Sequence, residues 1–210
     1  MKISIFLAAA LTAMACNSKT DTASSPGDAK TSENATEQKQ LYIDVHDLGK
    51  VTFADVEAAH KKDLATQEKY GVNFIKYWVD EDAGKVYCLS ETSDPEMITK
   101  THQEAHGLAP AKIHRVSDGP EVSLTGKQLF LDIHRLAPGS VNASAVADAH
   151  EKDLAVQEKY NVNFINYWLD EKEGVIMCLS EAPDSASVIN THKEAHGLTP
   201  HEISQVKQGE

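Results

Sequence analysis

Residues 41–46 of this chain read LYIDVH, and residues 129–134 read LFLDIH. The likeness continues downstream, because 33 of the 57 positions from His60 to Val116 are identical to the positions 90 residues later. Before His60 the offset is 88, so the second copy has two extra residues in its first loop, around 137–139. Two copies are too few for a solenoid. They favour two domains related by a pseudo-two-fold axis, as in a fused symmetric dimer.

Hydrophobic periodicity and turn residues predict the same elements in each copy. The expected order in the first copy is strand 41–46, helix 53–70, strand 72–79, strand 85–91, a second helix ending at Gly107, and strand 111–116. This β-α-β-β-α-β order is the ferredoxin-like split βαβ motif. The predicted fold class is therefore α+β: two tandem ferredoxin-like (βαββαβ) domains that form a pseudo-dimer with facing sheets.

The helices of such a domain cover one face of its sheet. We expect the other face to carry Asp44 and His46, together with Phe74 and Trp78 or their neighbours of opposite parity. Large aromatic side chains are not left exposed over a whole face. The two open faces should therefore pack on each other and bury Trp78 and Trp168.

The N-terminus has the features of an export signal. Lys2 precedes an apolar run over 3–13, and the stretch before Cys16 resembles a bacterial lipobox. We expect a lipoprotein anchored through Cys16 and facing the periplasm or cell surface. The alternative is cleavage at an A-x-A site (13–15), which gives a soluble periplasmic or secreted protein. The expected boundaries are signal peptide 1–15, disordered tether 16–40, repeat domain 41–116, linker 117–128 and repeat domain 129–206.

Composition excludes some partners. The net charge of −12 argues against nucleic-acid phosphate and suits cations. Hydrophobic residues make up 41% and charged residues 25%, as in ordinary globular proteins. Beyond the export signal, no segment has the length and apolarity to span a membrane. The compositional oddity is the ten histidines.

One histidine pair per copy has the spacing of a metal chelate. His102 and His106 are four residues apart on a helix, as are His192 and His196, so each pair shares one helix face. Glu104 points away from that face, which argues against the chemistry of zinc proteases. The alternative is a pair of surface histidines near a helix C-terminus.

A second candidate site lies at strand ends. His46 ends the first strand and Glu91 the third, and His134 and Glu181 repeat this. Treating those strands as parallel neighbours, we expect Asp44, His46 and Glu91 to converge beside the pseudo-two-fold axis, where imidazole and carboxylate suit a divalent cation. The alternatives are a structural His–carboxylate hydrogen bond and a Glu91 that faces the helices.

His60 and Asp63 share one face of the first helix, and His150 and Asp153 repeat them. The preferred interpretation is a half-buried histidine bonded to Asp63 or to the strand below, with metal binding as the alternative.

Each copy also has one cysteine in its third strand, Cys88 and Cys178. Inert packing, a thiolate ligand and a disulfide between the copies all remain open. A thiolate would favour nickel, copper or zinc over magnesium or calcium. His114 and His201 have no counterparts, and we expect both at the surface.

Together these strings resemble the nickel-binding ferredoxin-like family. They are 42–46 (YIDVH), 59–65 (AHKKDLA), 72–74 (VNF), 88–91 (CLSE) and 102–107 (HQEAHG), each repeated in the second copy. The resemblance implies a ferredoxin-like α+β fold, dimerisation, and binding of nickel or a similar divalent metal. Members are usually single domains that dimerise, and this chain departs from that pattern by fusing two copies.

The leading hypothesis is a non-enzymatic protein of the cell envelope that binds a divalent transition metal such as nickel, zinc or copper. The candidate ligands are His46, Glu91, His60, Cys88, His102, His106, His134, Glu181, His150, Cys178, His192 and His196. One alternative is an enzyme of the dimeric α+β barrel type, with a cavity between the sheets and His46 and Asp44 as general base. The other is an envelope interaction domain with incidental histidines.

Overall fold

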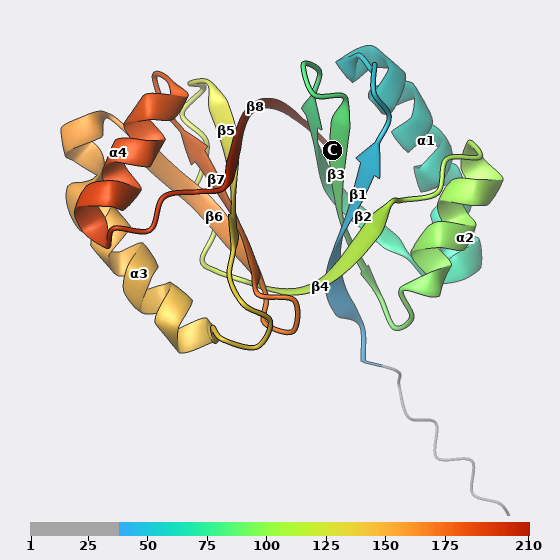
Figure 1. Ribbon diagram of the computed structural model, residues 1–210. Coiled ribbons are helices and arrows are strands. Elements are labelled where there is room, and N and C mark those ends of the chain that lie inside the picture. The colour runs from blue at the N-terminus through green and yellow to red at the C-terminus, as the bar shows by residue number, and fades with distance from the viewer. Residues whose placement is uncertain (1–37) are drawn as a thin grey trace, which may run out of the picture. The chain divides into compact units, whose positions relative to one another are not determined.

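The computed structural model describes residues 38–210, so the predicted export signal and Cys16 lie outside the described residues. Both copies have the predicted element order (Figure 1). Repeat 1 consists of β1 (Gln40–Asp47), α1 (Phe53–Tyr70), β2 (Asn73–Asp80), β3 (Lys85–Thr92), α2 (Glu96–Ala105) and β4 (Lys112–Asp118). Repeat 2 consists of β5 (Leu129–Arg135), α3 (Ala143–Val156), the 3₁₀ turn η1 (Gln157–Tyr160), β6 (Asn163–Asp170), β7 (Val175–Glu181), α4 (Ser185–Ala195) and β8 (Glu202–Gly209). Among these residues no helix is long and apolar enough to cross a membrane.

Local sequence explains where the first helix of each repeat begins and ends. The Thr52 hydroxyl accepts a hydrogen bond from the Asp55 amide, and the Asp55 carboxylate accepts one from the Thr52 amide, which completes a capping box. The helix stops at Gly71, whose φ of 67° is left-handed. Asn161 occupies the same position in repeat 2 with φ 56°. The predicted bounds of this helix in repeat 1, 53–70, are therefore confirmed.

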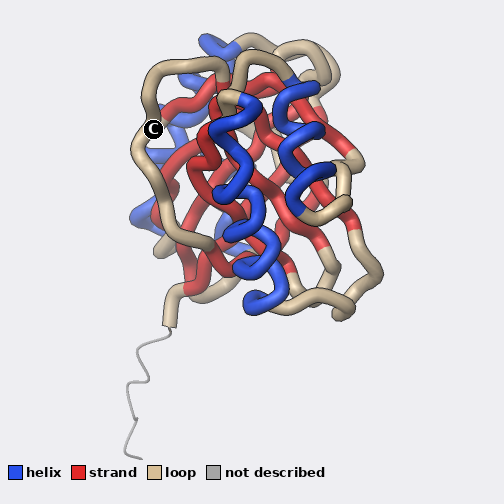
Figure 2. Tube along the Cα trace, turned by 90° about the vertical axis from the view of Figure 1, so that its left-hand side faces the viewer, coloured by secondary structure: helices blue, strands red, loops and turns tan. Residues whose placement is uncertain are grey.

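The eight strands form a closed barrel in the order β1-β3-β2-β8-β5-β7-β6-β4. Each repeat supplies a four-stranded antiparallel sheet, and its last strand also pairs with the other repeat, β4 with β6 and β8 with β2. The expected facing sheets are thus joined along both edges. Closure leaves neither sheet with an open edge strand. The helices lie outside the barrel, as Figures 1 and 2 show.

The barrel interior is filled with apolar side chains contributed by both repeats. The rings of Trp78 and Trp168 lie 4.8 Å apart there, which confirms the predicted burial of both. A recess of about 370 Å³ remains at one end of the barrel, and His46 is not among the residues that line it. The alternative of an enzyme cavity between the sheets, beside His46, therefore does not correspond to this recess.

The face assigned to the first strand is wrong. Ile43 packs inside the barrel with Leu41 and Val45, whereas Asp44 and His46 point outward beneath the helices. The apolar side chains of β1 pack in the barrel interior. Its polar side chains lie on the outer face, where side chains of the helices can interact with them. His46 and His134 consequently belong to separate clusters on the outer faces of two sheets rather than sharing the pseudo-two-fold axis.

A β-bulge reverses the expected alternation of inward and outward side chains along β2. Phe74 pairs with Ser90 and Lys76 pairs with Leu89, so one extra residue interrupts the alternation. Phe74 then faces the helices while Trp78 faces the barrel interior. The same irregularity occurs in repeat 2.

The expectation that His114 lies at the surface is also wrong, because β4 crosses to the other repeat. His114 is buried, and its Nδ1 lies 2.8 Å from Asp170 Oδ2 of β6. His201 is exposed, as expected, and its Nδ1 accepts a hydrogen bond from the Arg135 amide.

Candidate metal centre

β1 and β3 place three ligand-type side chains on the outer face of the repeat 1 sheet. Asp44 and His46 alternate along β1 and so point to the same side. Cys88 of β3 pairs directly with Asp44 in the antiparallel register. All three are buried, and Asp44 is 0% exposed.

α2 lays two imidazoles over these strands. His102 is 1% exposed and lies between two carboxylates. Its Nε2 is 3.3 Å from Asp44 Oδ1, and its Nδ1 is 2.9 Å from Oδ1 of Asp63, which comes from α1. One helical turn later, His106 Nε2 lies 3.1 Å from both His102 Nδ1 and Asp63 Oδ1. The predicted i, i+4 pair therefore shares one face, and that face is turned inward.

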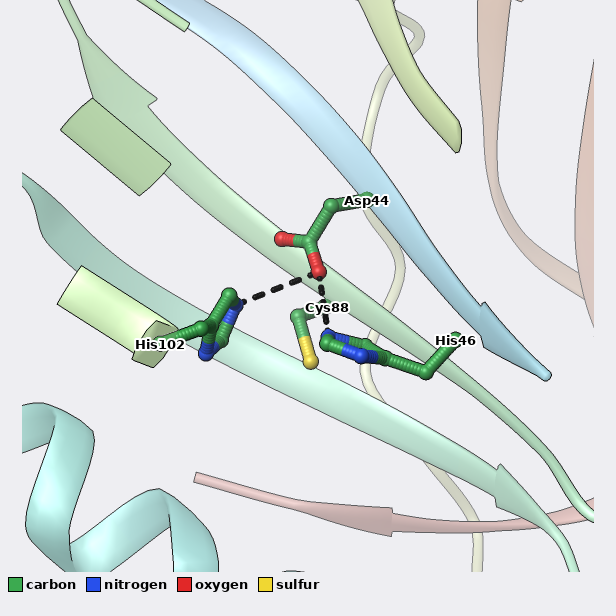
Figure 3. A group of neighbouring side chains, drawn as sticks. All are labelled: Asp44, His46, Cys88 and His102. Carbon is green, nitrogen blue, oxygen red and sulfur yellow. Dashed lines mark ion pairs between the residues drawn. The ribbon is translucent and has the colours of Figure 1, made fainter. Parts of the chain in front are cut away.

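These side chains form two groups, in each of which the ligand atoms lie within 4.8 Å of one another. We call Asp44, His46, Cys88 and His102 the inner donor set (Figure 3). Asp63, His102 and His106 form the outer donor set. The two sets share His102, which presents one ring nitrogen to each.

Several atoms of the inner donor set lack hydrogen bonds although they are buried. Both carboxylate oxygens of Asp44, Nε2 of His102 and Nδ1 of His46 have no partner with hydrogen-bond geometry. Asp44 Oδ1 nevertheless lies 3.0 Å from His46 Nε2. The atoms are thus close together but not directed at one another as donor and acceptor. Buried polar groups normally satisfy their bonding capacity, so a cation that accepts all these lone pairs fits the set.

Electrostatics in the metal-free cluster favour charge separation. Burial opposes the charged form of His102, but the Asp44 and Asp63 carboxylates outweigh it and raise the pKa of His102 to about 9. Burial also tends to raise the pKa of Asp44, yet contacts with His102 and His46 hold it below its usual value. Burial, together with these nearby carboxylates, raises the pKa of the Cys88 thiol well above its ordinary range. Metal binding would therefore displace protons from His102 and Cys88.

Repeat 2 reproduces the cluster with slightly longer contacts. Asp132 Oδ1 lies 3.2 Å from His134 Nε2, and Asp132 Oδ2 lies 3.4 Å from His192 Nε2. His192 Nδ1 is 3.0 Å from Asp153 Oδ1, and His196 Nε2 is 3.3 Å from the same carboxylate. The ligand-type groups are Asp132, His134 and Cys178, and Asp153, His192 and His196.

The expectation that Glu91 and Glu181 join this site is wrong. β1 and β3 are antiparallel, because β2 lies between α1 and β3 in the chain and runs parallel to β1. Glu91 therefore pairs with Leu41, at the end of β1 opposite His46. Glu181 pairs with Leu129 in the same way.

The expected hydrogen bond between His60 and Asp63 is absent, because Asp63 is occupied by the two histidines of α2. His60 instead packs its ring 4.6 Å from that of Tyr77, and its buried Nε2 has no hydrogen-bond partner. It lies beside the cluster but in neither donor set. Cys88 and Cys178 are both free thiols, so the disulfide alternative is not realised.

Sequence patterns placed Asp44 beside His46 at a possible cation site, but the set of candidate ligands contains none of the four aspartates. Asp44 and Asp132 were grouped with the strand ends, and Asp63 and Asp153 were assigned to the histidines of their own helices. A signal was available: Asp63 and His102 come from different helices, but both repeats contain the same pair. A carboxylate that accepts a hydrogen bond from an imidazole orients that imidazole as a metal ligand.

Comparison with known proteins identifies similar sequences. The profile of a family described as "Nickel responsive protein SCO4226-like" matches residues 42–116 and 130–206. The crystal structure of SCO4226 from Streptomyces coelicolor A3(2) is 39% identical over 36% of this chain and 90% of its own, with a TM-score of 0.34. No curated protein matches significantly.

Two more distant solved structures match most of the chain. A putative chlorite dismutase, TA0507, is 12% identical over 82% of this chain and 94% of its own, with a TM-score of 0.45. A putative monooxygenase from Lactobacillus acidophilus NCFM is 7% identical over 81% and 93%, with a TM-score of 0.47.

Proposed function

The chain belongs to the nickel responsive, SCO4226-like protein family, and on that premise we propose that it is a non-enzymatic binder of nickel or a similar divalent transition metal. Each repeat would hold at least one ion. The observation that carries the proposal is the inner donor set, whose buried ligand atoms lie within 4.8 Å of one another while Asp44 and His102 Nε2 lack hydrogen bonds.

The donor chemistry supports a borderline transition metal. Imidazole and thiolate suit nickel, copper and zinc, whereas magnesium and calcium prefer sites made of oxygen alone. Asp44 supplies one carboxylate, which offsets part of the charge of a divalent ion at a buried site. The group as a whole resembles a preformed metal site more than a structural hydrogen-bond network, because its members leave their lone pairs unused.

The outer donor set supports the inner one. A neutral His102 that donates from Nδ1 to Asp63 leaves the lone pair of Nε2 directed at the inner set. Such a carboxylate–histidine–metal arrangement fixes the ring and increases its basicity as a ligand. His106 lies next to His102 and Asp63. It is the least buried member of the outer donor set and therefore lies nearest to solvent.

The direct test is native mass spectrometry of residues 17–210 with a panel of divalent metals near neutral pH. We expect at least two Ni²⁺ ions per chain, and one fewer in His46→Ala. His201→Ala is the matched control, because His201 is exposed and lies outside both donor sets, so it should bind as the wild type does. Failure of nickel, copper and zinc to bind the wild type would refute the proposal.

We also propose that the protein is exported and held at a membrane by a lipid on Cys16. The support is the sequence alone: an apolar run, a small-residue cleavage site and a single cysteine ahead of a polar segment. Mass analysis of the N-terminal peptide should find a lipidated Cys16, and Cys16→Ala should move the protein to the soluble fraction. An intact N-terminus at Met1 would exclude export by this route.

A further inference from the structure

The two repeats differ in the space between the first helix and the sheet. In repeat 2 this pocket has a volume of about 250 Å³, whereas its counterpart in repeat 1 has about 90 Å³. The apolar walls of the larger pocket are formed by Leu136, Val141, Val146, Ile176 and Leu198. Its polar lining includes His134, His150, His192 and His196, so the pocket opens directly onto the donor sets.

One aromatic side chain accounts for part of this difference. In repeat 1, Phe53 begins α1 and stacks on Tyr77 with ring centroids 5.7 Å apart. Ala143 occupies that position in repeat 2 and has no ring to cover Tyr167. Tyr167 accordingly lines the larger pocket, while Tyr77 is 1% exposed and does not line the smaller one.

The larger pocket contains a polar group without a partner. His150 lines it and is partly exposed, and within residues 38–210 its imidazole makes no hydrogen bond. Its ring lies 5.0 Å from that of Tyr167. An accessible imidazole among apolar walls is the arrangement of a small-molecule site, in which a few polar groups orient an apolar ligand.

Size and charge restrict what can occupy the pocket. An apolar protein cavity of about 150 Å³ is enough to bind benzene, so the repeat 2 pocket accommodates one substituted ring. Asp153 lines the pocket and repels anions, while the surrounding apolar walls favour a neutral ring over a charged group. A neutral ring with one hydroxyl remains.

We propose that the repeat 2 pocket binds a small phenol, with the ring between Val141, Val146 and Ile176 and the hydroxyl hydrogen-bonded to His150. This site goes beyond metal binding, because it depends on the pocket and on no bound ion. Repeat 1 lacks the site in the wild type, since Phe53 covers Tyr77 and the remaining space is small.

The test is a titration of 4-methylphenol into the metal-free chain, followed by calorimetry or amide chemical shifts. We expect one saturable site per chain. Ala149→Leu fills the pocket directly and should weaken binding by at least about tenfold. Ala59→Leu is the matched change in repeat 1 and should leave the binding unaltered.

Two further variants keep the result decisive. Val141→Phe fills the same pocket from the loop before α3, so it reproduces the loss if Ala149→Leu fails to fold. Phe53→Ala should uncover Tyr77 and add a second, weaker phenol site. Nickel binding by each variant, measured separately, reports whether the clusters are intact. The proposal would be overturned if the wild type showed no saturable binding up to about 1 mM. It would also be overturned if Ala149→Leu and Ala59→Leu bound the phenol equally well.

Discussion

Repeats 1 and 2 contain the same ligand-type residues, but they hold the glutamate at the end of their third strand in different ways. Glu91 is half-buried and accepts one long hydrogen bond, 3.5 Å, from Asn73. Glu181 is 0% exposed and accepts hydrogen bonds from the linker at Thr125, Gly126 and Lys127. Identical residues in homologous strands thus differ because the chain that precedes each repeat differs. The two repeats share the cluster of His, Asp and Cys side chains. They do not share the linker contacts of Glu181, which exist because a linker joins the two copies.

The largest expected effect tests the shared part. His102→Ala removes the one residue common to both donor sets of repeat 1, and His192→Ala removes its counterpart in repeat 2, which lies between Asp132 and Asp153. Each should abolish the ion of its own repeat, weakening that site on the order of 100-fold or more, and leave the other site unaltered. Competition with a chelator measures both affinities. Two unchanged sites in either variant would show that the cluster is not the metal centre.

The next prediction tests the unshared part. Glu181→Gln removes the charge and replaces one carboxylate oxygen with an NH2 group, so some buried linker donors face another donor; it should destabilise the protein by about 2–4 kcal/mol. Glu91→Gln should change the free energy of unfolding by less than about 0.5 kcal/mol. Equilibrium unfolding in guanidinium compares the two. Equal effects would mean that the linker adds nothing to repeat 2.

The pH dependence of that difference has a defined sign. Burial of Glu181 is outweighed by hydrogen bonds from Thr125 and its neighbours, which lower the pKa of the carboxyl to about 2. A depressed native pKa contributes stability that is complete above the unfolded value, about 4.3, and is lost as pH falls toward 2. The gap between wild type and Glu181→Gln should therefore be constant near neutrality and close below pH 4.5. A gap independent of pH would contradict a charged Glu181.

Sequence patterns predicted the elements of the fold because their signals are local. The helix over 53–70 and the apolar alternation of β1 each depend on residues a few positions apart, and in the structure Thr52 and Gly71 cap that helix. The burial of Trp78 followed from size and hydrophobicity alone.

The orientation of side chains depends on contacts between distant segments. The bulge at Phe74 reverses the parity of β2 without a glycine or proline to mark it. Likewise, Asp63 turns to His102 rather than to His60, because α2 brings a second imidazole within reach. The burial of His114 depends on β4 reaching the other repeat, which no property of β4 alone predicts.

A related pH-dependent effect should occur in both repeats. The Asp44 and Asp63 carboxylates outweigh burial and raise the pKa of His102 to about 9, and their counterparts raise that of His192 to about 10. A raised native pKa gives stability that is complete below about 6.5 and lost as pH rises through 9 to 10. The metal-free protein should then lose on the order of 3 kcal/mol or more per histidine over that range. His102→Gln and His192→Gln should each remove part of this dependence.

The smallest expected effect concerns an exposed Lys–Glu ion pair that is present in both repeats. Lys69 Nζ lies 2.5 Å from Glu104 Oε2, and Lys159 Nζ lies 2.5 Å from Glu194 Oε2. In each repeat a tyrosine hydroxyl also donates a hydrogen bond to the same carboxylate. These groups are exposed, so solvent screens the attraction and side-chain ordering offsets most of what remains. Glu104→Gln and Glu194→Gln should produce small and equal shifts of the unfolding midpoint that vanish in about 1 M salt. A larger shift in one repeat would show that the difference between the repeats extends from the linker to the helices.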